Sequence, residues 1–472
     1  MTSADTSVRP RRPMGVPLLA SLVMGSMVGA GVFSLPSAFA GTAGGTGALA
    51  AWAIAGTGML LLALVFQRLA VARPELDSGI VAYAKAGFGP YVGFFSAFGY
   101  WAAACIANVT YWVLVSSTLG ALVPALGDGG TWAAFALGSV GLWAFHLVIA
   151  RGMTQAAVLN AVTTVAKFVP LLMFVALVAF GGFSWDVFRD NLAGGAELGG
   201  IADQVRSTML VTVFVFLGVE GASVYSRYAR RREDVGRATV LGFLSVLTLF
   251  VVVTMLSYGV LPREELAALD QPSAAGVLEA AVGTWGAWLI GGGLLVSVLG
   301  AYLSWTLLAT EVLFEAASQE DAPRFLARTS ARGVPIAALA ATSLVTQLFL
   351  LVSRFSEDAF GFSLDLTSAL AIIPYLLTAG FGLRQALADR GRRATVIAVG
   401  ALAYTVYLVY AMGLAYALIA LLVYAPASVL YVWARRERGI RVFSRGEAVL
   451  CAATLLGAIA AIVALAQGVV TL

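Results

Sequence analysis

Long apolar segments recur along the whole chain, and short polar stretches separate them. Segments of about 20 apolar residues predict membrane-spanning helices, because a helix of that length crosses the hydrocarbon core of a bilayer. The sequence predicts about thirteen such helices. Their ranges are 16–39, 46–70, 90–122, 131–150, 156–181, 207–225, 238–261, 282–314, 334–353, 361–383, 394–411, 413–433 and 447–470. The predicted fold class is therefore an all-α integral membrane protein.

The basic residues fall mainly on one side of this predicted bundle. If the N-terminus is cytoplasmic, 24 of the 29 lysine and arginine residues lie in cytoplasmic segments. The others are Arg189, Arg206, Arg263 and Arg354 on the outer side, and Lys167 within a span. This bias satisfies the positive-inside rule, and one missed or invented helix would disturb it. We expect a multi-pass protein of the bacterial inner membrane, with a cytoplasmic N-terminus and, after an odd number of spans, a C-terminus outside.

The composition supports this class and excludes others. Of 472 residues, 60% are hydrophobic and 11% are charged, which excludes a soluble protein. Abundant arginine, alanine and glycine are typical of a GC-rich bacterial gene. No solvated basic domain is present that could bind nucleic acid. Cys105 and Cys451 lie in apolar segments, so neither a disulfide nor a metal site is expected.

Enzyme and channel functions find little support in the sequence. His146 is the single histidine, and it lies in an otherwise apolar segment. No phosphate-binding loop follows a strand, because no strand is predicted. A channel would need a ring-forming selectivity sequence, and none is visible. We therefore expect no enzyme activity and no cofactor.

Two of the apolar segments are interrupted by glycine. Residues 25–33 read Gly-Ser-Met-Val-Gly-Ala-Gly-Val-Phe within the first span, and residues 218–221 read Gly-Val-Glu-Gly within the sixth. Inside hydrocarbon every backbone N–H and C=O group needs a partner, so an unwound segment persists only where it lines a cavity. Paired interruptions in corresponding halves of a chain indicate the binding site of a transporter. The sequence therefore predicts a carrier.

The two interruptions lie about 190 residues apart, which predicts an internal repeat of five spans. Because five is an odd number, the second repeat enters the membrane from the opposite side, and the repeats are inverted with the site between them. The predicted organisation is a cytoplasmic tail (1–15), an inverted-repeat transporter core (16–390) with broken helices 1 and 6, and C-terminal helices 11 to 13 (391–472). These last helices could serve lipid packing or oligomerisation, for example as a homodimer.

The first break offers donors for an anion. Ser26 precedes it, and Gly29 and Gly31 flank Ala30. Backbone N–H groups at the start of the second half-helix carry the positive end of its dipole and suit a carboxylate. The alternative is close helix packing through small residues, which is common in membrane bundles. The matching second break favours a substrate site.

Two ionisable residues lie at membrane depth. Glu220 is in the second break, and acids at such depth usually mark an ion, substrate or proton path. Its alternative role is a gating hydrogen bond to nearby backbone without substrate contact. Lys167 in the fifth span needs carbonyl or carboxylate partners when buried. It could fix the first break in place of a coupling cation, or extend to the cytoplasmic surface, which its depth from Arg151 argues against.

Polar, small and aromatic residues on other spans could complete the site. They are Ala103, Ala104 and Asn108 in the third span, Phe214 in the sixth, Trp305 in the eighth, and Asp365, Thr367 and Ser368 in the tenth. Aromatic rings can hold a cation against their faces, and an amide at membrane depth needs a hydrogen-bond partner. Each residue alone would usually serve packing. Only their convergence on two broken helices makes them candidates.

Several stretches resemble one known family of transporters. They are residues 25–33, 216–222, 234–239 and 304–311, together with Pro374-Tyr375 and Tyr424-Ala-Pro426. In these stretches the chain resembles the amino acid–polyamine–organocation (APC) superfamily, and within it the basic amino acid/polyamine antiporters of the arginine:ornithine exchanger type. The resemblance covers nearly the whole chain and includes the thirteenth span, which many relatives lack.

This resemblance implies a role for each candidate. Ser26, Gly29 and Gly31 would bind the substrate carboxylate. Carbonyl groups near Gly218 would bind its α-ammonium group, and Glu220 would couple binding to gating. The positions where arginine/agmatine exchangers contact the guanidinium end are occupied by Ala103, Ala104, Asn108, Trp305, and Thr367 or Ser368. Lys167 falls where sodium-independent members carry a lysine in place of sodium.

Two residues depart from the pattern of the family. Phe214 stands where the subfamily usually has tryptophan, and its weaker ring quadrupole would hold a guanidinium group less tightly. Asp365 is unexpected, and it could pair directly with the cationic end of the substrate, favouring lysine or ornithine over arginine. These departures leave the preferred substrate open.

The predicted function is the exchange of basic amino acids (arginine, ornithine, lysine) by alternating access, without sodium. Exchange between substrates of equal charge needs no ion gradient, which agrees with a lysine where sodium would bind. The alternative is a proton-coupled amino acid symporter or exporter with Glu220 as the titrating group. The expected partners are the small-molecule substrate and membrane lipid.

Overall fold

The structure, a computed structural model, describes residues 15–76, 79–152, 156–220 and 232–469, and every regular element in these ranges is a helix. The helices up to residue 182 are α1 (Val16–Met27), η1 (Gly31–Ser34), α2 (Leu35–Ala40), α3 (Gly45–Ala72), α4 (Ile80–Phe88), α5 (Pro90–Gly120), η2 (Pro124–Leu126), α6 (Trp132–Ala150), α7 (Ala156–Leu177) and the π-helical turn η3 (Val178–Gly182).

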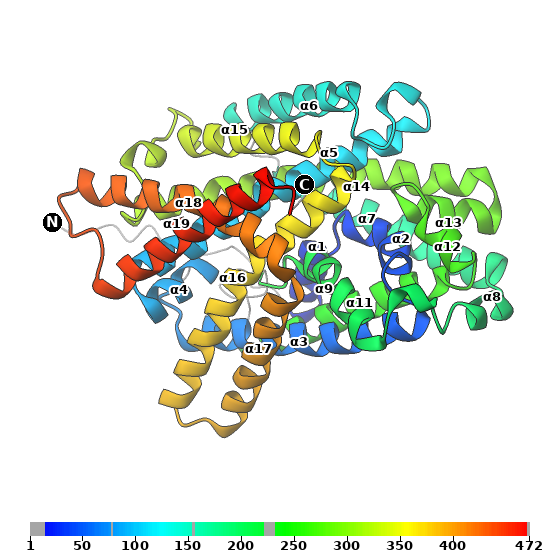
Figure 1. Cartoon of the computed structure of the whole chain (residues 1–472), viewed down its shortest axis with the longest axis horizontal. Helices are drawn as coiled ribbons and strands as arrows, with labels where there is room; N and C mark the ends of the chain where they lie inside the picture. Colours follow the sequence, from blue (N-terminus) through cyan, green and yellow to red (C-terminus); the bar gives the residue numbers. More distant parts are fainter. Residues whose placement is uncertain (1–14, 77–78, 153–155, 221–231, 470–472) are drawn as a thin grey trace.

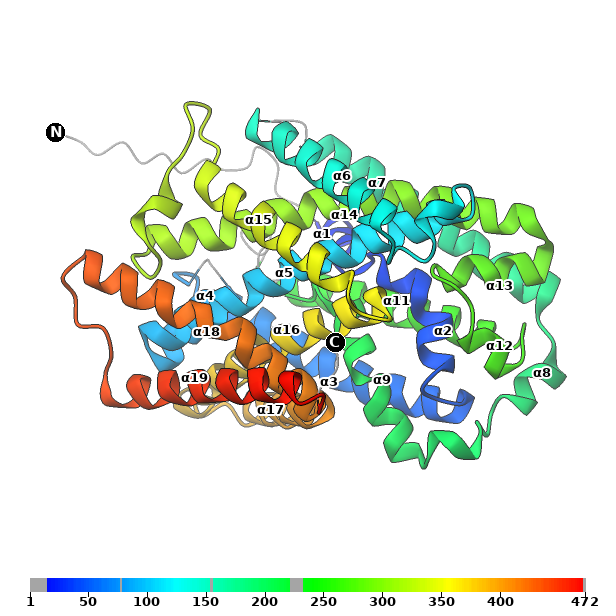
Figure 2. The ribbon, with the colours of Figure 1, turned by 45° about the horizontal axis from the view of Figure 1, so that its top comes forward.

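The remaining helices follow in chain order. They are α8 (Trp185–Asp190), η4 (Ala196–Leu198), α9 (Ile201–Phe216), α11 (Arg232–Ser257), α12 (Arg263–Ala267), α13 (Ser273–Val282), α14 (Thr284–Ser318), η6 (Arg324–Ala327), α15 (Ile336–Ser353), α16 (Ala359–Ala388), α17 (Arg392–Ala411), α18 (Gly413–Glu437) and α19 (Arg445–Ala466). Figures 1 and 2 show the long helices α3, α5, α14 and α16 around the shorter α1, α2 and α9.

Each of the thirteen predicted spans is occupied by helix in the described part of the chain. Ten described helices are long and apolar enough to cross a membrane, and the bent pair formed by α1 and η1–α2 makes eleven. The two other predicted spans, 156–181 and 207–225, adjoin or include residues outside the described ranges. The count of thirteen therefore stays a prediction, as does the tail 1–15, of which only Gly15 is described.

The first break divides a helix at the predicted place. α1 ends at Met27, and the N–H of Val28 makes the last bond in the helical register, to the carbonyl of Met24 at 2.9 Å. The chain then continues as η1 and α2, and the two halves are bent by 53°. Pro36 lies in the first turn of α2, where the missing N–H costs no helical hydrogen bond.

The second break begins where α9 ends at Phe216, and residues 217–220 form a turn. Gly218 has a φ of +102°, a conformation that residues with a side chain rarely adopt. A Cβ atom at this position would also lie 2.3 Å from the carbonyl oxygen of Ser26. Only glycine fits where the two broken segments cross. Gly221 and the rest of the stretch up to residue 231 lie outside the described residues.

The helices of the two predicted repeats pack in a reciprocal pattern. α1 packs against α11, and α9 packs against α3. Similarly, α5 packs against α16 and α14 packs against α7, while α3 contacts α16 and α11 contacts α7. Suppose that α1, α3, α5, α6 and α7 of the first repeat correspond, in this order, to α9, α11, α14, α15 and α16 of the second. Replacing each helix by its counterpart then turns the α1–α11 contact into α9–α3, the α5–α16 contact into α14–α7, and the α3–α16 contact into α11–α7.

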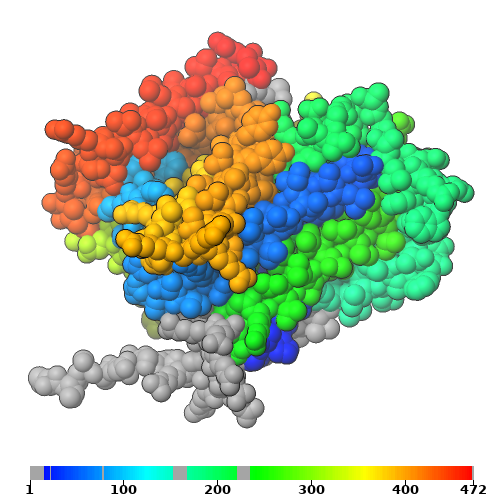
Figure 3. All heavy atoms as spheres, turned by 90° about the horizontal axis from the view of Figure 1, so that it is seen from below, coloured from blue at the N-terminus to red at the C-terminus, as the bar shows by residue number. Residues whose placement is uncertain are grey.

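The three C-terminal helices cover one side of this core. Figure 3 shows α17 beside α3, which lies beside α11. α18 packs against α5 and α16, and Tyr424 of α18 lies over Gly99, where a Cβ atom would be 1.7 Å from the tyrosine oxygen. The ring of Tyr424 stacks on Phe95 at 4.1 Å. α19 packs against α18 and exposes apolar side chains such as Leu456, as expected of a helix that faces lipid.

Candidate functional site

A central cavity lies where the two broken helices meet α5 and α14. It is lined by Ser26, Met27, Gly29, Ala30 and Gly31 of the first break, Ala107 and Tyr111 of α5, Phe214, Val215 and Leu217 at the end of α9, and Trp305 of α14. Its volume is about 10 Å³, close to the roughly 10–15 Å³ that one water molecule needs. The helices therefore enclose the site closely in this conformation, and the cavity has room for little more than one water molecule.

Five predicted site residues meet in this cavity, namely Ser26, Gly29, Gly31, Phe214 and Trp305. Gly31 packs directly on α9, because a Cβ atom there would lie 2.7 Å from Cγ1 of Val215. At Gly29 the nearest atom to a Cβ would be the hydroxyl oxygen of Tyr111 at 3.6 Å. Gly31 thus lets the two broken helices touch, whereas Gly29 leaves space beside a hydroxyl group.

The first break presents backbone donors to this cavity. Gly29 and Ala30 lie between α1 and η1, and their N–H groups have no acceptor among the described residues. N–H groups at the start of a helical segment carry the positive end of its dipole. Val215 and Leu217, which also line the cavity, lie where α9 ends and leaves carbonyl groups without helical donors. One side of the cavity therefore suits an anion, and the other suits a cation.

The Ser26 hydroxyl group connects the two breaks. It donates to the carbonyl oxygen of Gly218 at 2.9 Å and to that of Val23 at 2.8 Å. The carbonyl group of Gly218, a predicted acceptor for the substrate ammonium group, is thus already bonded to Ser26 in this conformation. A substrate that used either group would have to compete with this contact.

The buried Glu220 carboxylate joins three elements. It accepts hydrogen bonds from the hydroxyl groups of Tyr100 on α5 and Tyr375 on α16, the second at 2.7 Å. The backbone N–H of Gly218 donates to the same carboxylate at 3.2 Å. The ring of Tyr100 lies 6.3 Å from that of Trp305, which lines the central cavity. Glu220 is not among the lining residues, so these contacts fit its gating role better than direct contact with a substrate.

Lys167 on α7 is buried, with 4% of its surface exposed, and its Nζ donates to the carbonyl oxygen of Gly25 at 3.2 Å. In a continuous helix this carbonyl group would accept from the N–H of Gly29, four residues on. Lys167 takes the place of that donor, and its charge lies at the negative end of the α1 dipole. The side chain therefore bonds the end of α1 rather than extending to the surface, and its role in transport stays a prediction.

Asn108, Ala103 and Ala104 are buried on α5. The Nδ2 of Asn108 donates to the hydroxyl oxygen of Thr306 at 3.1 Å, and its Oδ1 has no partner among the described residues. Ala107 precedes Asn108 and Trp305 precedes Thr306 in the sequence, and both Ala107 and Trp305 line the central cavity. Asn108 is thus adjacent to the cavity, whereas Ala103 and Ala104 lie one turn further along α5 and do not line it.

Thr367 and Ser368 on α16 use their hydroxyl groups to bond backbone. The hydroxyl of Thr367 donates to the carbonyl of Ser363 at 2.8 Å within the same helix. The hydroxyl of Ser368 donates to the carbonyl of Leu210 on α9 at 2.7 Å. Neither residue lines the central cavity, so the structure places them in helix packing, and their contact with a substrate stays a prediction.

A second cavity of about 390 Å³ opens at the N-terminal end of α16, and we call it the acidic cavity. Its acidic lining residues are Asp128, Asp270, Glu357, Asp358 and Asp365, and its described lining includes no lysine or arginine. Val211 of α9 lines this cavity, and Phe214, three residues on, lines the central one. The two cavities are therefore about one helical turn apart. Asp365 lines the acidic cavity and not the central one, so its direct pairing with a substrate stays a prediction.

From the sequence we expected Tyr111 only as an aromatic ring that could hold a cation, and we assigned no role to Tyr100 or Tyr375. Tyr100 and Tyr375 are the donors to Glu220, and the hydroxyl of Tyr111 faces Gly29. A signal was available, because a buried carboxylate needs hydrogen-bond donors. Which hydroxyl groups reach the Glu220 carboxylate depends on how α5 and α16 pack, and this packing could not be predicted from the sequence.

A bundle of membrane-length helices, with two broken segments meeting at a central cavity, defines the class of membrane transporters. Residues 15–466 match the model of the amino acid permease family, and the chain belongs to this family.

Named relatives cover almost the whole chain. The arginine/ornithine antiporter of Pseudomonas aeruginosa is 47% identical over 96% of this chain and 97% of its own length. The L-lysine transport protein of Corynebacterium glutamicum is 41% identical, over 98% and 97%. The arginine/agmatine antiporter of Chlamydia pneumoniae is 35% identical, over 93% of each chain. The family and these relatives are transporters rather than enzymes.

Proposed function

We propose that this protein exchanges basic amino acids across the bacterial inner membrane by alternating access, without sodium. The names of the full-length relatives support a basic amino acid as substrate. The observation that carries the proposal is the central cavity, which is lined both by Gly29 and Ala30, whose N–H groups have no acceptor among the described residues, and by the carbonyl end of α9. This arrangement matches the carboxylate and ammonium groups that every α-amino acid carries.

The side chain of the substrate would then extend towards α5 and α14. Trp305 of α14 lines the cavity on this side and Phe214 lines it from α9, and aromatic faces attract cations. The amide oxygen of Asn108, next to Trp305, has no partner in the described part of the chain and could accept from a guanidinium or ammonium group. The amide would have to face the enlarged cavity once the helices separate.

The inverted repeat and the orientation of the chain belong to the same proposal. The reciprocal packing of α1 with α11 and α9 with α3 supports two repeats related by an axis in the membrane plane. The distribution of basic residues supports a cytoplasmic N-terminus and a C-terminus outside. In that orientation the acidic cavity opens to the outside, one turn of α9 from the substrate site. Its carboxylates would attract cationic substrates and raise their local concentration.

Asp365→Asn is expected to raise the KM for arginine, ornithine and lysine severalfold at low ionic strength, with a smaller effect on kcat. The reason is that an acidic cavity attracts a cationic substrate before the substrate reaches the central site. Salt weakens this attraction, because charges more than about 10 Å apart are largely screened at 0.1 M. Uptake kinetics at two salt concentrations test it. Glu265→Gln removes an exposed carboxylate of α12 that does not line the cavity, and it serves as the control. An equal loss at both salt concentrations would assign Asp365 a structural role.

Exchange in reconstituted vesicles is expected to persist when choline replaces sodium and when an ionophore collapses the proton gradient. Lys167 supplies a permanent donor to Gly25 where a coupling cation would otherwise be needed. The measurement is labelled arginine entering vesicles loaded with ornithine. Loss of exchange without a proton gradient would instead favour the proton-coupled symporter or exporter with Glu220 as the titrating group.

A further inference from the structure

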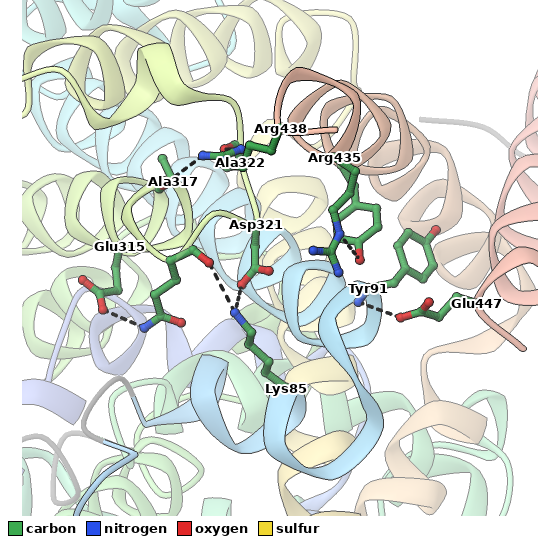
Figure 4. Close-up of polar contacts among 11 residues, drawn as sticks. Lys85, Tyr91, Glu315, Ala317, Asp321, Ala322, Arg435, Arg438 and Glu447 are labelled. Atoms are coloured by element: carbon green, nitrogen blue, oxygen red, sulfur yellow. Dashed lines mark hydrogen bonds and ion pairs between the residues drawn. The ribbon is translucent and has the colours of Figure 1, made fainter. Parts of the chain in front are cut away.

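A cluster of polar side chains lies at the end of the molecule opposite the acidic cavity (Figure 4). We call it the Asp321 cluster, and it comprises Lys85, Asp321, Arg438 and Glu447. Lys85 is in the last turn of α4, and Asp321 is in the connection between α14 and η6. Their side chains form an ion pair, and Nζ of Lys85 also lies 3.4 Å from the carbonyl oxygen of Gln319.

The backbone at the end of α14 fixes the position of Asp321. The N–H groups of Asp321 and Ala322 both donate to the carbonyl of Ala316, at 2.9 and 3.1 Å, and Glu320 adopts a φ of +69°. The Asp321 side chain is consequently 6% exposed. Burial raises the pKa of Asp321, and the charges of Lys85, Arg435 and Arg438 oppose that rise. The cations around Asp321 thus offset part of what its carboxylate loses in hydration.

Lys85 is held in turn by α5. Gly93 of α5 lies against its side-chain stem, where a Cβ atom would be 2.5 Å from the Cβ of Lys85. The Lys85–Asp321 pair thus ties the start of α5 to the end of α14. These two helices carry Tyr111 and Trp305, which lie on the wall of the central cavity.

The C-terminal helices bond to the same two ends. From α18, Arg438 donates to the carbonyl of Ala322 at 3.1 Å and to that of Ala317 at 3.3 Å, which caps the negative end of α14. From α19, the carboxylate of Glu447 accepts from the backbone N–H of Tyr91, in the first turn of α5, at 3.1 Å. Helices outside the predicted repeats are thus fastened to both helices of the cavity wall.

We propose that the Asp321 cluster, with α18 and α19, is a permanent clamp that keeps α5 and α14 at a fixed spacing throughout the transport cycle. This assigns a role to the C-terminal helices, and it makes Asp321 a positioning residue for Tyr111 and Trp305. The inference rests on the proposed function, because it concerns the wall of the proposed substrate site. A small change in the spacing of groups that hold a substrate has large effects on turnover and binding.

Asp321→Asn is expected to raise the KM for arginine by about tenfold with a smaller change in kcat, because the site loses its spacing. The double variant Lys85→Asp with Asp321→Lys restores the ion pair in reverse and is expected to recover most of the affinity. Glu437→Gln is the matched control, since Glu437 at the end of α18 is exposed and its one hydrogen bond within the described ranges is from the N–H of Arg324. An unchanged KM in Asp321→Asn would overturn the positioning role.

A cross-link distinguishes a permanent clamp from a contact that opens. Lys85→Cys and Asp321→Cys are joined by a short bifunctional thiol reagent, with Cys105 and Cys451 replaced by alanine. A permanent clamp predicts that the cross-linked protein keeps most of its exchange rate. Loss of exchange upon cross-linking would show that the contact must open, which contradicts the proposal. The wild type is measured in the same vesicles, and its exchange activity tests the proposed function. The clamp is tested separately, by the rate of each variant divided by the rate of the wild type.

Discussion

Lys167→Ala is expected to lower the rate of exchange at least about tenfold, because a hydrogen bond from a charged group contributes about 1.5–3 kcal/mol and 1.4 kcal/mol corresponds to a factor of ten. The variant leaves the carbonyl of Gly25 without its donor. The nearest replacement is the N–H of Gly29, which would extend α1 by a residue and withdraw a donor from the central cavity. The measurement is the initial rate of labelled arginine entry into vesicles loaded with ornithine.

Val169→Ala is the control for this experiment. Val169 lies two residues further along α7 and is 50% exposed, so its truncation tests the helix without affecting the first break. The amount of protein in the membrane should be the same in both variants. A Lys167→Ala protein that exchanges at the rate of the wild type would remove the assigned role of the lysine.

Glu220→Gln is the second change with a large expected effect. The glutamine has one acceptor oxygen where the carboxylate has two, and its NH2 group would face a tyrosine hydroxyl or the N–H of Gly218. We expect exchange to fall about tenfold or more, as for the loss of hydrogen bonds to a charged group. We also expect the pH dependence of the rate to change, because the variant removes the carboxylate of this network.

Tyr375→Phe is the matched variant, since it removes one donor and keeps the carboxylate. It should reduce the rate less than Glu220→Gln and leave the shape of the pH profile closer to that of the wild type. A Glu220→Gln protein with an unaltered pH profile would argue that Glu220 is not coupled to proton movement. The lower exchange rate of Glu220→Gln would then reflect only the loss of the hydrogen bonds that Glu220 makes to Tyr100, Tyr375 and Gly218.

The two breaks could be predicted from the sequence because their cause is local. Gly29, Gly31 and Gly218 lie inside apolar spans, and the matching positions of the two interruptions distinguish them from glycines that serve helix packing. The structure confirms that helices end at these places, and it gives the reason for Gly218, which touches the carbonyl of Ser26. Lys167 was predictable for the same reason, because a buried ammonium group needs acceptors.

Residues whose role depends on packing between distant helices could not be predicted in this way. Asp365 shares the tenth span with Ser368, yet it lines the acidic cavity while Ser368 bonds to α9. The rotation and tilt of α16 decide this difference, and the uniformly apolar sequence of a membrane helix does not reveal them. The contact between Asp321 and Lys85 joins positions 236 residues apart, so it too emerged only from the fold.

The measurement that tests the account most directly is counterflow in proteoliposomes without any ion gradient. Vesicles are loaded with unlabelled ornithine, lysine or buffer alone, and labelled arginine is added outside. Obligatory exchange predicts transient accumulation of label only in vesicles that contain a basic amino acid, with one molecule leaving for each that enters. Equal uptake into vesicles loaded with buffer alone, or uptake that requires an imposed proton gradient, would contradict obligatory exchange.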